Sequence, residues 1–233
     1  MPPYLIIIAG MLGAIIARKL TIPAALTGGV TGLLVFTGSG YTGIGIMATF
    51  FIVGSAATLF KKELKRKLNA DEQHNGRRTA AQVLANSGVP AICGMLTLFV
   101  YPKYESTLSI MIAASLAAAM GDTLSSELGM VYGKRFFNIL SFKREQPGLD
   151  GVISLEGTLI GVAGSAIIAA IYAIGFGWSG GVFVIIIAGT TGNLADSVFG
   201  AAFERKHYIG NNAVNFLNTL VAALVAWGLY CSL

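Results

Sequence analysis

Long apolar runs separated by short basic segments recur along the chain from Tyr4 almost to the C-terminus. Backbone amides cannot stay unpaired in hydrocarbon, so runs of this length are expected to form membrane-spanning helices. Eight are predicted, over residues 4–17, 23–37, 43–60, 80–101, 107–133, 151–176, 180–203 and 212–232. The pattern therefore predicts an all-α polytopic membrane protein with about eight transmembrane helices in a single domain, residues 1–233.

The composition excludes a soluble globule. Hydrophobic residues make up 55% of the 233 residues and charged residues only 12%, whereas soluble domains carry about 25% charged residues. Mean hydropathy is +0.72. Cys93 and Cys231 lie in apolar stretches without metal-ligand spacing and are expected to be packing residues. No basic segment precedes the first apolar run, so a retained helix is expected there rather than a cleaved signal.

The basic residues predict the orientation. Fifteen of the 16 Lys and Arg lie in alternate loops, and only Lys103 lies in the loops between them. Cytoplasmic loops retain Lys and Arg, so the basic loops, 61–79 and 134–150 among them, are expected to be cytoplasmic, with both termini outside and the plasma membrane as default location. Orientation bias explains part of this charge, and binding of phosphate or anionic headgroups is the alternative.

Four carboxylates lie inside predicted spans, where they are costly without a task or a partner: Asp122, Glu127, Glu156 and Asp196. By helical rise they lie roughly 9 to 18 Å from the nearest cytoplasmic basic residues. Five amides share this depth: Asn86, Asn193, Asn211, Asn215 and Asn218. Interhelical hydrogen bonding is the simpler explanation for any one of them. Together they predict a polar cleft that opens to the cytoplasm.

A sequence repeat carries these polar residues. The segment 121–129, Gly-Asp-Thr-Leu-Ser-Ser-Glu-Leu-Gly, aligns without gaps to 192–200, Gly-Asn-Leu-Ala-Asp-Ser-Val-Phe-Gly, at an offset of 71 residues. The basic pair 134–135 meets 205–206 at the same offset. The fourth and fifth spans thus resemble the sixth and seventh, which predicts a tandem helical-hairpin repeat. Chance similarity among Gly-, Ala- and Ser-rich helices is the competing account.

The residue types suit chemistry on phosphate with a metal ion. Mg²⁺ is commonly held by one or two carboxylates together with substrate phosphates. Asp122 with Ser125 and Ser126 offers one oxygen-lined face, and Asp196 with Asn193 offers a second. The basic, glycine-containing loop 143–154 enters a helix and can present amides to phosphate, although its Pro-Gly and Asp-Gly pairs are also ordinary turn residues. His74 and His207 fall in loops and are expected to be solvated rather than catalytic.

The ordered motifs resemble the integral-membrane family that contains transmembrane protein 19 and plant phytyl-phosphate kinase. They are Gly-Arg-Arg at 76–78, Gln-Val-Leu-Ala-Asn-Ser-Gly at 82–88, the segment 121–129, Pro-Gly-Leu-Asp-Gly-Val-Ile-Ser at 147–154, Asp-Ser-Val-Phe-Gly at 196–200 and Asn-Asn-Ala-Val-Asn-Phe at 211–216. The chain departs from the family pattern at Leu149 and Ile153, where a small or polar residue and a glycine are expected.

The resemblance implies a membrane enzyme of lipid metabolism. The expected reaction is Mg²⁺-dependent transfer of a phosphoryl group from a nucleoside triphosphate such as CTP to an isoprenyl monophosphate, for example phytyl phosphate, giving the diphosphate. The expected partners are this lipid and the membrane, with self-association left open and no nucleic acid.

Site residues are assigned as a hypothesis. Asp122, Glu127 and Asp196 hold Mg²⁺, with Glu156 in support. The residues expected to orient or contact phosphate are Arg77, Arg78, Asn86, Ser126, Lys143, Arg144, Ser154, Ser197, Asn211 and Asn215.

Three other functions are compatible with intramembrane acids and repeats. A secondary transporter of a small anionic or phosphorylated solute needs a polar path to both faces, and the outer half of the fifth span offers only Ser109 and Ser115 after Thr107. A lipid cytidylyltransferase would release pyrophosphate instead of a nucleoside diphosphate. A noncatalytic scaffold leaves the buried acids without a task.

Overall fold

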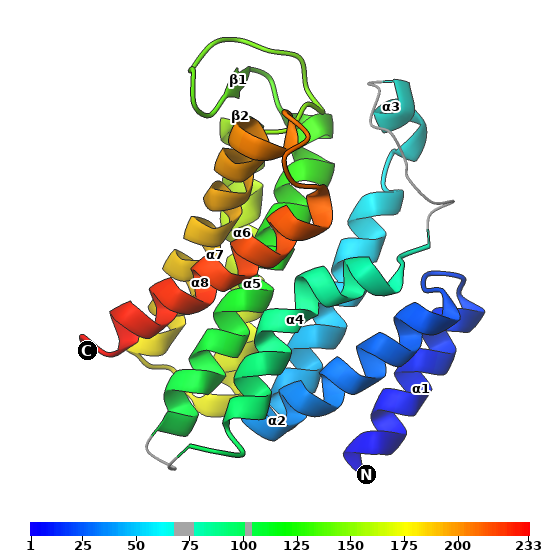
Figure 1. Cartoon of the computed structure of the whole chain (residues 1–233), viewed down its shortest axis with the longest axis vertical. Helices are drawn as coiled ribbons and strands as arrows, with labels where there is room; N and C mark the ends of the chain where they lie inside the picture. Colours follow the sequence, from blue (N-terminus) through cyan, green and yellow to red (C-terminus); the bar gives the residue numbers. More distant parts are fainter. Residues whose placement is uncertain (68–76, 101–103) are drawn as a thin grey trace.

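The computed structural model shows a bundle of helices (Figure 1). It describes residues 1–67, 77–100 and 104–233, without the side chains of 66 and 67. Its helices are α1 (Pro3–Ile16), α2 (Ile22–Leu59), α3 (Lys62–Lys67), α4 (Ala80–Leu96), α5 (Glu105–Tyr132), α6 (Leu155–Phe176), α7 (Gly180–Phe199) and α8 (Asn211–Tyr230). A π-helical segment, η2 (Gly200–Glu204), continues α7. His74, Lys103 and the expected helix end at Tyr101 lie outside the described residues.

The expected apolar segments are found as helices. Five described helices are long and apolar enough to cross a membrane, while α1 and α4 are apolar but shorter. The second and third expected spans form one helix, α2, that is broken at Gly40. Gly40 has φ 56° and ψ −145°, a conformation that only glycine adopts readily. The break turns the chain back on itself and leaves two limbs, 22–39 and 41–59 (Figure 1).

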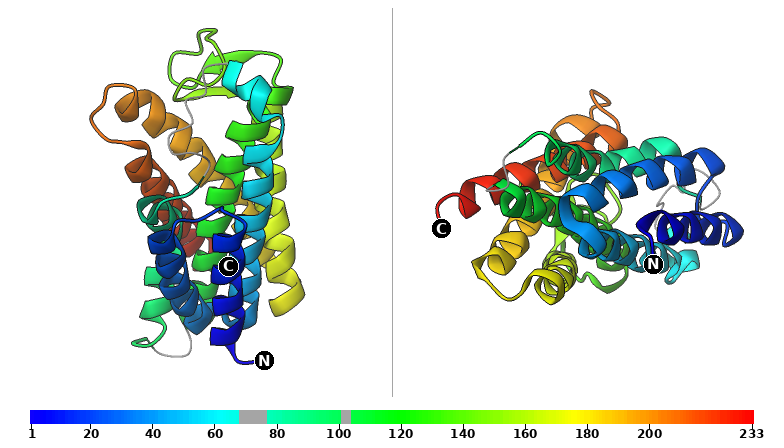
Figure 2. Two further views of the ribbon diagram at one scale, coloured as in Figure 1. Left: turned by 90° about the vertical axis from the view of Figure 1, so that its right-hand side faces the viewer. Right: turned by 90° about the horizontal axis from the view of Figure 1, so that it is seen from below.

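Helix α5 is the centre of the bundle. It packs against α2, α4, α6, α7 and α8, and 83% of its most apolar 18-residue stretch is buried. The small residues between Ala113 and Ala119 lie almost entirely inside, and they let the surrounding helices approach closely. Figure 2 shows the bundle from two further directions, with α1 at its edge, where it packs on α2. The fifth predicted span is therefore the one least exposed to surrounding lipid.

The expected all-α fold is confirmed, with one small addition. Residues 136–138 (β1, Phe136–Asn138) and 152–154 (β2, Val152–Ser154) form a short antiparallel hairpin, with Phe136 opposite Ser154. Three-residue strands are too short to produce a recognisable alternation in sequence, so this segment was expected to be a loop. Both chain ends lie away from this hairpin (Figure 1). Ser154 also caps α6, since its hydroxyl accepts a hydrogen bond from the Gly157 amide.

The contact between α2 and α4 depends on Gly94. A Cβ atom at this position would lie 1.9 Å from the carbonyl oxygen of Leu34, and Thr37 donates a hydrogen bond to the Gly94 carbonyl. We expect Gly94→Ala to lower the free energy of unfolding by about 1–3 kcal/mol, because backbone must move to admit the methyl group. Thermal denaturation in detergent measures the effect.

The matched control is Gly228→Ala in α8, where nothing lies within 4 Å of the added Cβ. Replacing a glycine by alanine in a helix is otherwise favourable by up to about 1 kcal/mol, so this variant should be as stable as the parent or more so. Equal melting temperatures for the two variants would contradict the close contact between α2 and α4.

Candidate functional site

Two carboxyl groups from separate helices meet inside the bundle. Asp122 on α5 and Asp196 on α7 lie in side-chain hydrogen-bond contact, and both residues are half-buried. Two carboxylates in such close contact repel each other unless a proton or a cation lies between them. Two of the three predicted metal ligands are therefore brought together, at a place that favours positive charge.

The contacts between the two repeat motifs are reciprocal. Asp122, at position 2 of the first motif, contacts Asp196, at position 5 of the second. Conversely, Ser125 at position 5 of the first donates a hydrogen bond to Oδ1 of Asn193 at position 2 of the second, over 2.9 Å. Helices α5 and α7 run in the same direction (Figure 1). Exchange of equivalent partners is the signature of a local two-fold relation, which supports the tandem repeat.

Asn218 adds a third group to the aspartate pair. Its Nδ2 donates a hydrogen bond to Asp196 Oδ1 over 2.7 Å, and the residue is fully buried. Its amide oxygen accepts no hydrogen bond from any residue that the structure describes. Asn218 was recognised as one of the amides on a face of the last span but was not among the predicted site residues. The spacing of 211, 215 and 218 was the signal that could have included it.

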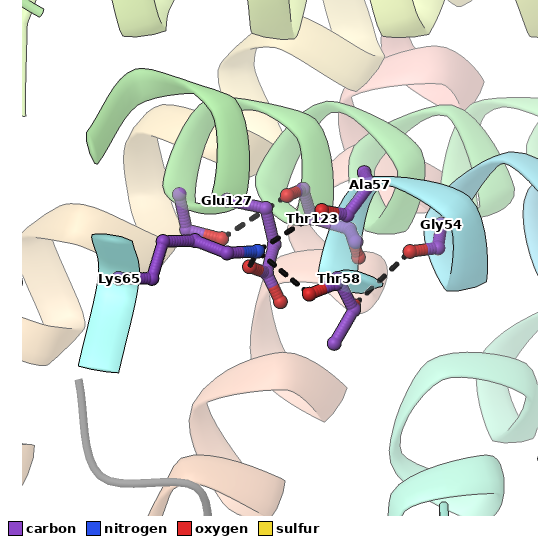
Figure 3. A network of polar contacts seen from close by, with 7 residues as sticks. Gly54, Ala57, Thr58, Lys65, Thr123 and Glu127 are labelled. Carbon is purple, nitrogen blue, oxygen red and sulfur yellow. Dashed lines mark hydrogen bonds and ion pairs between the residues drawn. The ribbon is translucent and has the colours of Figure 1, made fainter. Parts of the chain in front are cut away.

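Glu127, the third predicted metal ligand, has another partner. The ammonium of Lys65 on α3 pairs with the Glu127 carboxylate and donates to the carbonyls of Ala57, over 3.0 Å, and Thr58, over 2.7 Å. Figure 3 shows Lys65 reaching from α3 to this network. Within the ranges that the structure describes, no three His, Cys, Asp or Glu side chains are grouped for one metal ion. Glu127 is thus separate from the aspartate pair, because it lies on the face of α5 that Lys65 covers.

Arg78 lies inside the bundle, whereas Arg77 is exposed. The Arg78 guanidinium stacks over the ring of Phe50 at 5.3 Å. A Cβ at Gly54 would lie 3.1 Å from its Nη2 and 3.4 Å from Cγ2 of Thr123, so this cation lies beside the second limb of α2 where that limb faces α5. Burial lowers the pKa of Arg78, and the charge of Glu127 opposes this effect. Arginine nevertheless keeps its charge, which makes Arg78 a cation suited to phosphate.

The π-helical end of α7 contributes a further carboxylate, Glu204, that the sequence did not suggest. Asn211 hydrogen-bonds Glu204 and accepts a hydrogen bond from Asn215 Nδ2 over 2.8 Å. The charge of Asp196 also acts on Glu204. Two predicted residues, Asn211 and Asn215, thus lie in a polar row that leads from α8 toward the aspartate pair. Single π-helical turns are uncommon and often mark functional sites.

The loop between the strands packs on this same end of α7. Arg205 donates to the carbonyl of Asp150 over 2.7 Å and pairs with Glu145 at 2.8 Å. The hydrogen bond from Arg205 lowers the pKa of Glu145. Lys143 and Arg144, predicted to contact phosphate, are exposed on this loop. Arg205 belongs to the second of the two repeated basic pairs, 134–135 and 205–206, and it therefore has a structural role.

Most of the remaining predicted residues form hydrogen bonds with backbone groups close to them. Asn86 donates to the carbonyl of Gln82, and Ser126 donates to the carbonyl of Thr123. Glu156 accepts a hydrogen bond from the backbone amide of Lys134 over 3.3 Å. Ser154 is buried as the cap of α6, and Ser197 is half-buried beside Asp196 in sequence. None of these hydrogen bonds links Asn86 or Glu156 to the aspartate pair.

Comparison with known proteins defines the family. A family model described as integral membrane protein DUF92 matches residues 5–223. The chain belongs to the DUF92 family of integral membrane proteins. The aspartate pair, Asn218 and the polar row on α8 all lie within the matched range. This DUF92 protein has no match among solved structures.

Relatives of this DUF92 protein occur in archaea, cyanobacteria and plants. An uncharacterized membrane protein of Methanocaldococcus jannaschii is 35% identical over 86% of this chain and 81% of its own length. An uncharacterized membrane protein of Synechocystis is 29% identical over 94% and 86%. The chloroplastic protein VTE6 of Arabidopsis thaliana is 29% identical over 84% of this chain and 60% of its own length. The similarity therefore extends over nearly the whole membrane domain.

Proposed function

We propose that this DUF92 protein transfers a phosphoryl group from a nucleoside triphosphate, with CTP as first choice, to an isoprenyl monophosphate. The observation that carries the proposal is the contact between Asp122 and Asp196 inside the bundle. The resemblance of the motifs to the family that contains plant phytyl-phosphate kinase supports the choice of substrate class, and the chloroplastic protein VTE6 of Arabidopsis thaliana is among the relatives. The protein is embedded in a membrane, where such a lipid is found.

The residues present fit a divalent cation. Asp122 and Asp196 supply carboxylate oxygens, and the Asn218 amide oxygen is buried and accepts no hydrogen bond from the part of the chain that the structure describes. Oxygen donors of these types are the ligands that Mg²⁺ prefers. Asp122, Asp196 and Asn218 would hold the ion, and bound Mg²⁺ would supply positive charge that neutralises phosphate. Glu127 pairs with Lys65 and Glu156 accepts a hydrogen bond from the Lys134 amide, so both would only contribute to the charge balance of the site.

The reaction needs no general base, because the acceptor phosphate is already anionic near neutral pH. An oxygen of the lipid phosphate attacks the terminal phosphorus of the nucleotide, and the bond to the bridging oxygen breaks, so that the nucleoside diphosphate leaves with that oxygen. Catalysis then consists of holding repelling phosphates together. Half-buried Arg78 would supply positive charge for phosphate, and exposed Arg77, Lys143 and Arg144 would attract nucleotide.

The test is a product analysis with purified protein in detergent or nanodiscs. The protein is incubated with CTP or ATP, Mg²⁺ and phytyl monophosphate, and the products are identified by mass spectrometry. We expect phytyl diphosphate and a nucleoside diphosphate, with no turnover once EDTA removes Mg²⁺. Release of pyrophosphate with a nucleotidyl-lipid product would instead identify a cytidylyltransferase. Exchange of a labelled phosphorylated solute across proteoliposomes without nucleotide would identify a transporter.

A further inference from the structure

A long apolar groove lies between the first limb of α2, α4 and α8. Its volume is about 820 Å³, and its lining runs along α4 from Ala81 to Met95, with Leu26 and Val30 of α2 on one side and Phe216 of α8 on the other. By helical rise this is about 21 Å of helix. Figure 1 shows α4 between the blue first limb of α2 and the orange-to-red α8. The volume lies in the range of sites that bind small organic ligands.

The shape of the groove follows from side-chain sizes on α4. Its floor carries small residues, among them Ala85 and Gly88, which are buried, while Val30 and Ile92 at its rim are 60% and 46% exposed. Phe216 lies against Gly88, where an added Cβ would come within 3.1 Å of its ring. Exposed aliphatic residues alone are normal on a membrane protein, since they contact lipid. A continuous groove among them is different, because one hydrocarbon chain can lie along it.

One end of the groove adjoins the candidate site. Ala81 in the first turn of α4 and Asn212 at the start of α8 both line it, so the two helix N-termini meet at this end. The residue before Asn212 is Asn211, which hydrogen-bonds Glu204 in the polar row that leads toward Asp196. Exposed Arg77 lies just before α4. The groove is therefore apolar along most of its length, and the amide of Asn212 lines it at the end nearest the aspartate pair.

We infer that this groove binds the hydrocarbon tail of the phosphorylated lipid substrate, with the phosphate at the start of α8. The inference rests on the proposed function for the identity of the headgroup. The same helix, α8, carries the groove residues Ala213 and Phe216 and the site residues Asn215 and Asn218. A lipid whose tail lies in the groove would thus have its charged end at the start of α8. The residues that contact Asp196 lie on another face of this same helix. An isoprenoid chain fits a groove whose walls are mostly apolar and that ends at Asn212.

The experiment combines photolabelling with a comparison of chain lengths. A phytyl monophosphate analogue with a diazirine on its tail is irradiated with the protein in nanodiscs, and labelled peptides are mapped by mass spectrometry. Label is expected on α4, α8 and the first limb of α2. Ala81→Phe and Ala213→Phe place a bulky ring at exposed small residues of the groove. The control is Ala163→Phe, at an exposed alanine of α6 outside it.

Each groove variant is expected to reduce the labelling and to lower the ratio of kcat/KM for phytyl monophosphate to that for isopentenyl monophosphate by roughly tenfold. This corresponds to lost contact with about two methylene groups. Ala163→Phe should keep the parent ratio. If one groove variant fails to fold, the other variant and the label on the unchanged protein still test the inference.

The outcomes separate this inference from the proposed function. Labelling of the groove that unlabelled phytyl monophosphate displaces, in a protein without turnover, supports the groove and removes the kinase assignment. Normal turnover with label on other helices overturns the groove and leaves the kinase assignment. Displacement of the label by phosphatidylglycerol as readily as by phytyl monophosphate also overturns the inference, because the groove would then hold ordinary membrane lipid.

Discussion

Replacing either central aspartate by its amide, Asp122→Asn or Asp196→Asn, should lower kcat on the order of a thousandfold. The amide keeps the size of the side chain and much of its hydrogen bonding, but it removes negative charge from the place where a cation is expected. Loss of one group that stabilises the transition state costs on the order of a hundredfold to a thousandfold, and loss of a metal ligand also weakens binding of the ion. Turnover of phytyl monophosphate over a range of Mg²⁺ concentrations measures both effects.

The matched control is Glu105→Gln, which neutralises an exposed carboxylate at the opposite end of the same helix, α5. It should keep the parent activity. Size-exclusion profiles in detergent establish that the variants remain folded, which is expected because each change is isosteric. Parent rates in both Asn variants would remove the aspartate pair from the mechanism.

The second large effect is expected on stability, at Lys65. Its side chain is 6% exposed and that of Glu127 21%, and the ammonium also bonds two carbonyls at the end of α2. Lys65→Met leaves the Glu127 charge and both carbonyls without this donor. Removing one partner of a buried ion pair costs about 3–5 kcal/mol. Because Glu127 keeps some contact with solvent, we expect about 3 kcal/mol, seen as a lower melting temperature in detergent.

A double-mutant cycle isolates the pair. Glu127→Gln in the Lys65→Met background removes the uncompensated charge and should restore part of the lost stability. Lys206→Met removes one positive charge from an exposed position and should change stability by less than about 0.5 kcal/mol. If Lys65→Met melts at the same temperature as Lys206→Met, the ion pair does not anchor α3.

The convergence of Asp122 and Asp196 could be predicted because each acid occurs at a similar depth in a repeated motif. Depth along a helix follows directly from residue number and helical rise. The partner of each acid was harder to predict. Glu127 was assigned to Mg²⁺ together with the aspartates, yet it pairs with Lys65 from a helix outside the repeat. Asn218 was recognised on the face of α8 but was not assigned to Asp196.

The sequence by itself determined the apolar helices, the reversal near Gly40, the basic loops and the level at which acids and amides lie. These features depend on hydropathy and backbone geometry, which are local properties of a few turns of chain. Only the tertiary structure decided which faces meet: the reciprocal contacts of α5 with α7, the docking of Lys65, and the groove beside α4. Rotation and spacing of packed helices depend on how small and large side chains from distant segments fit together, and no single segment contains that information.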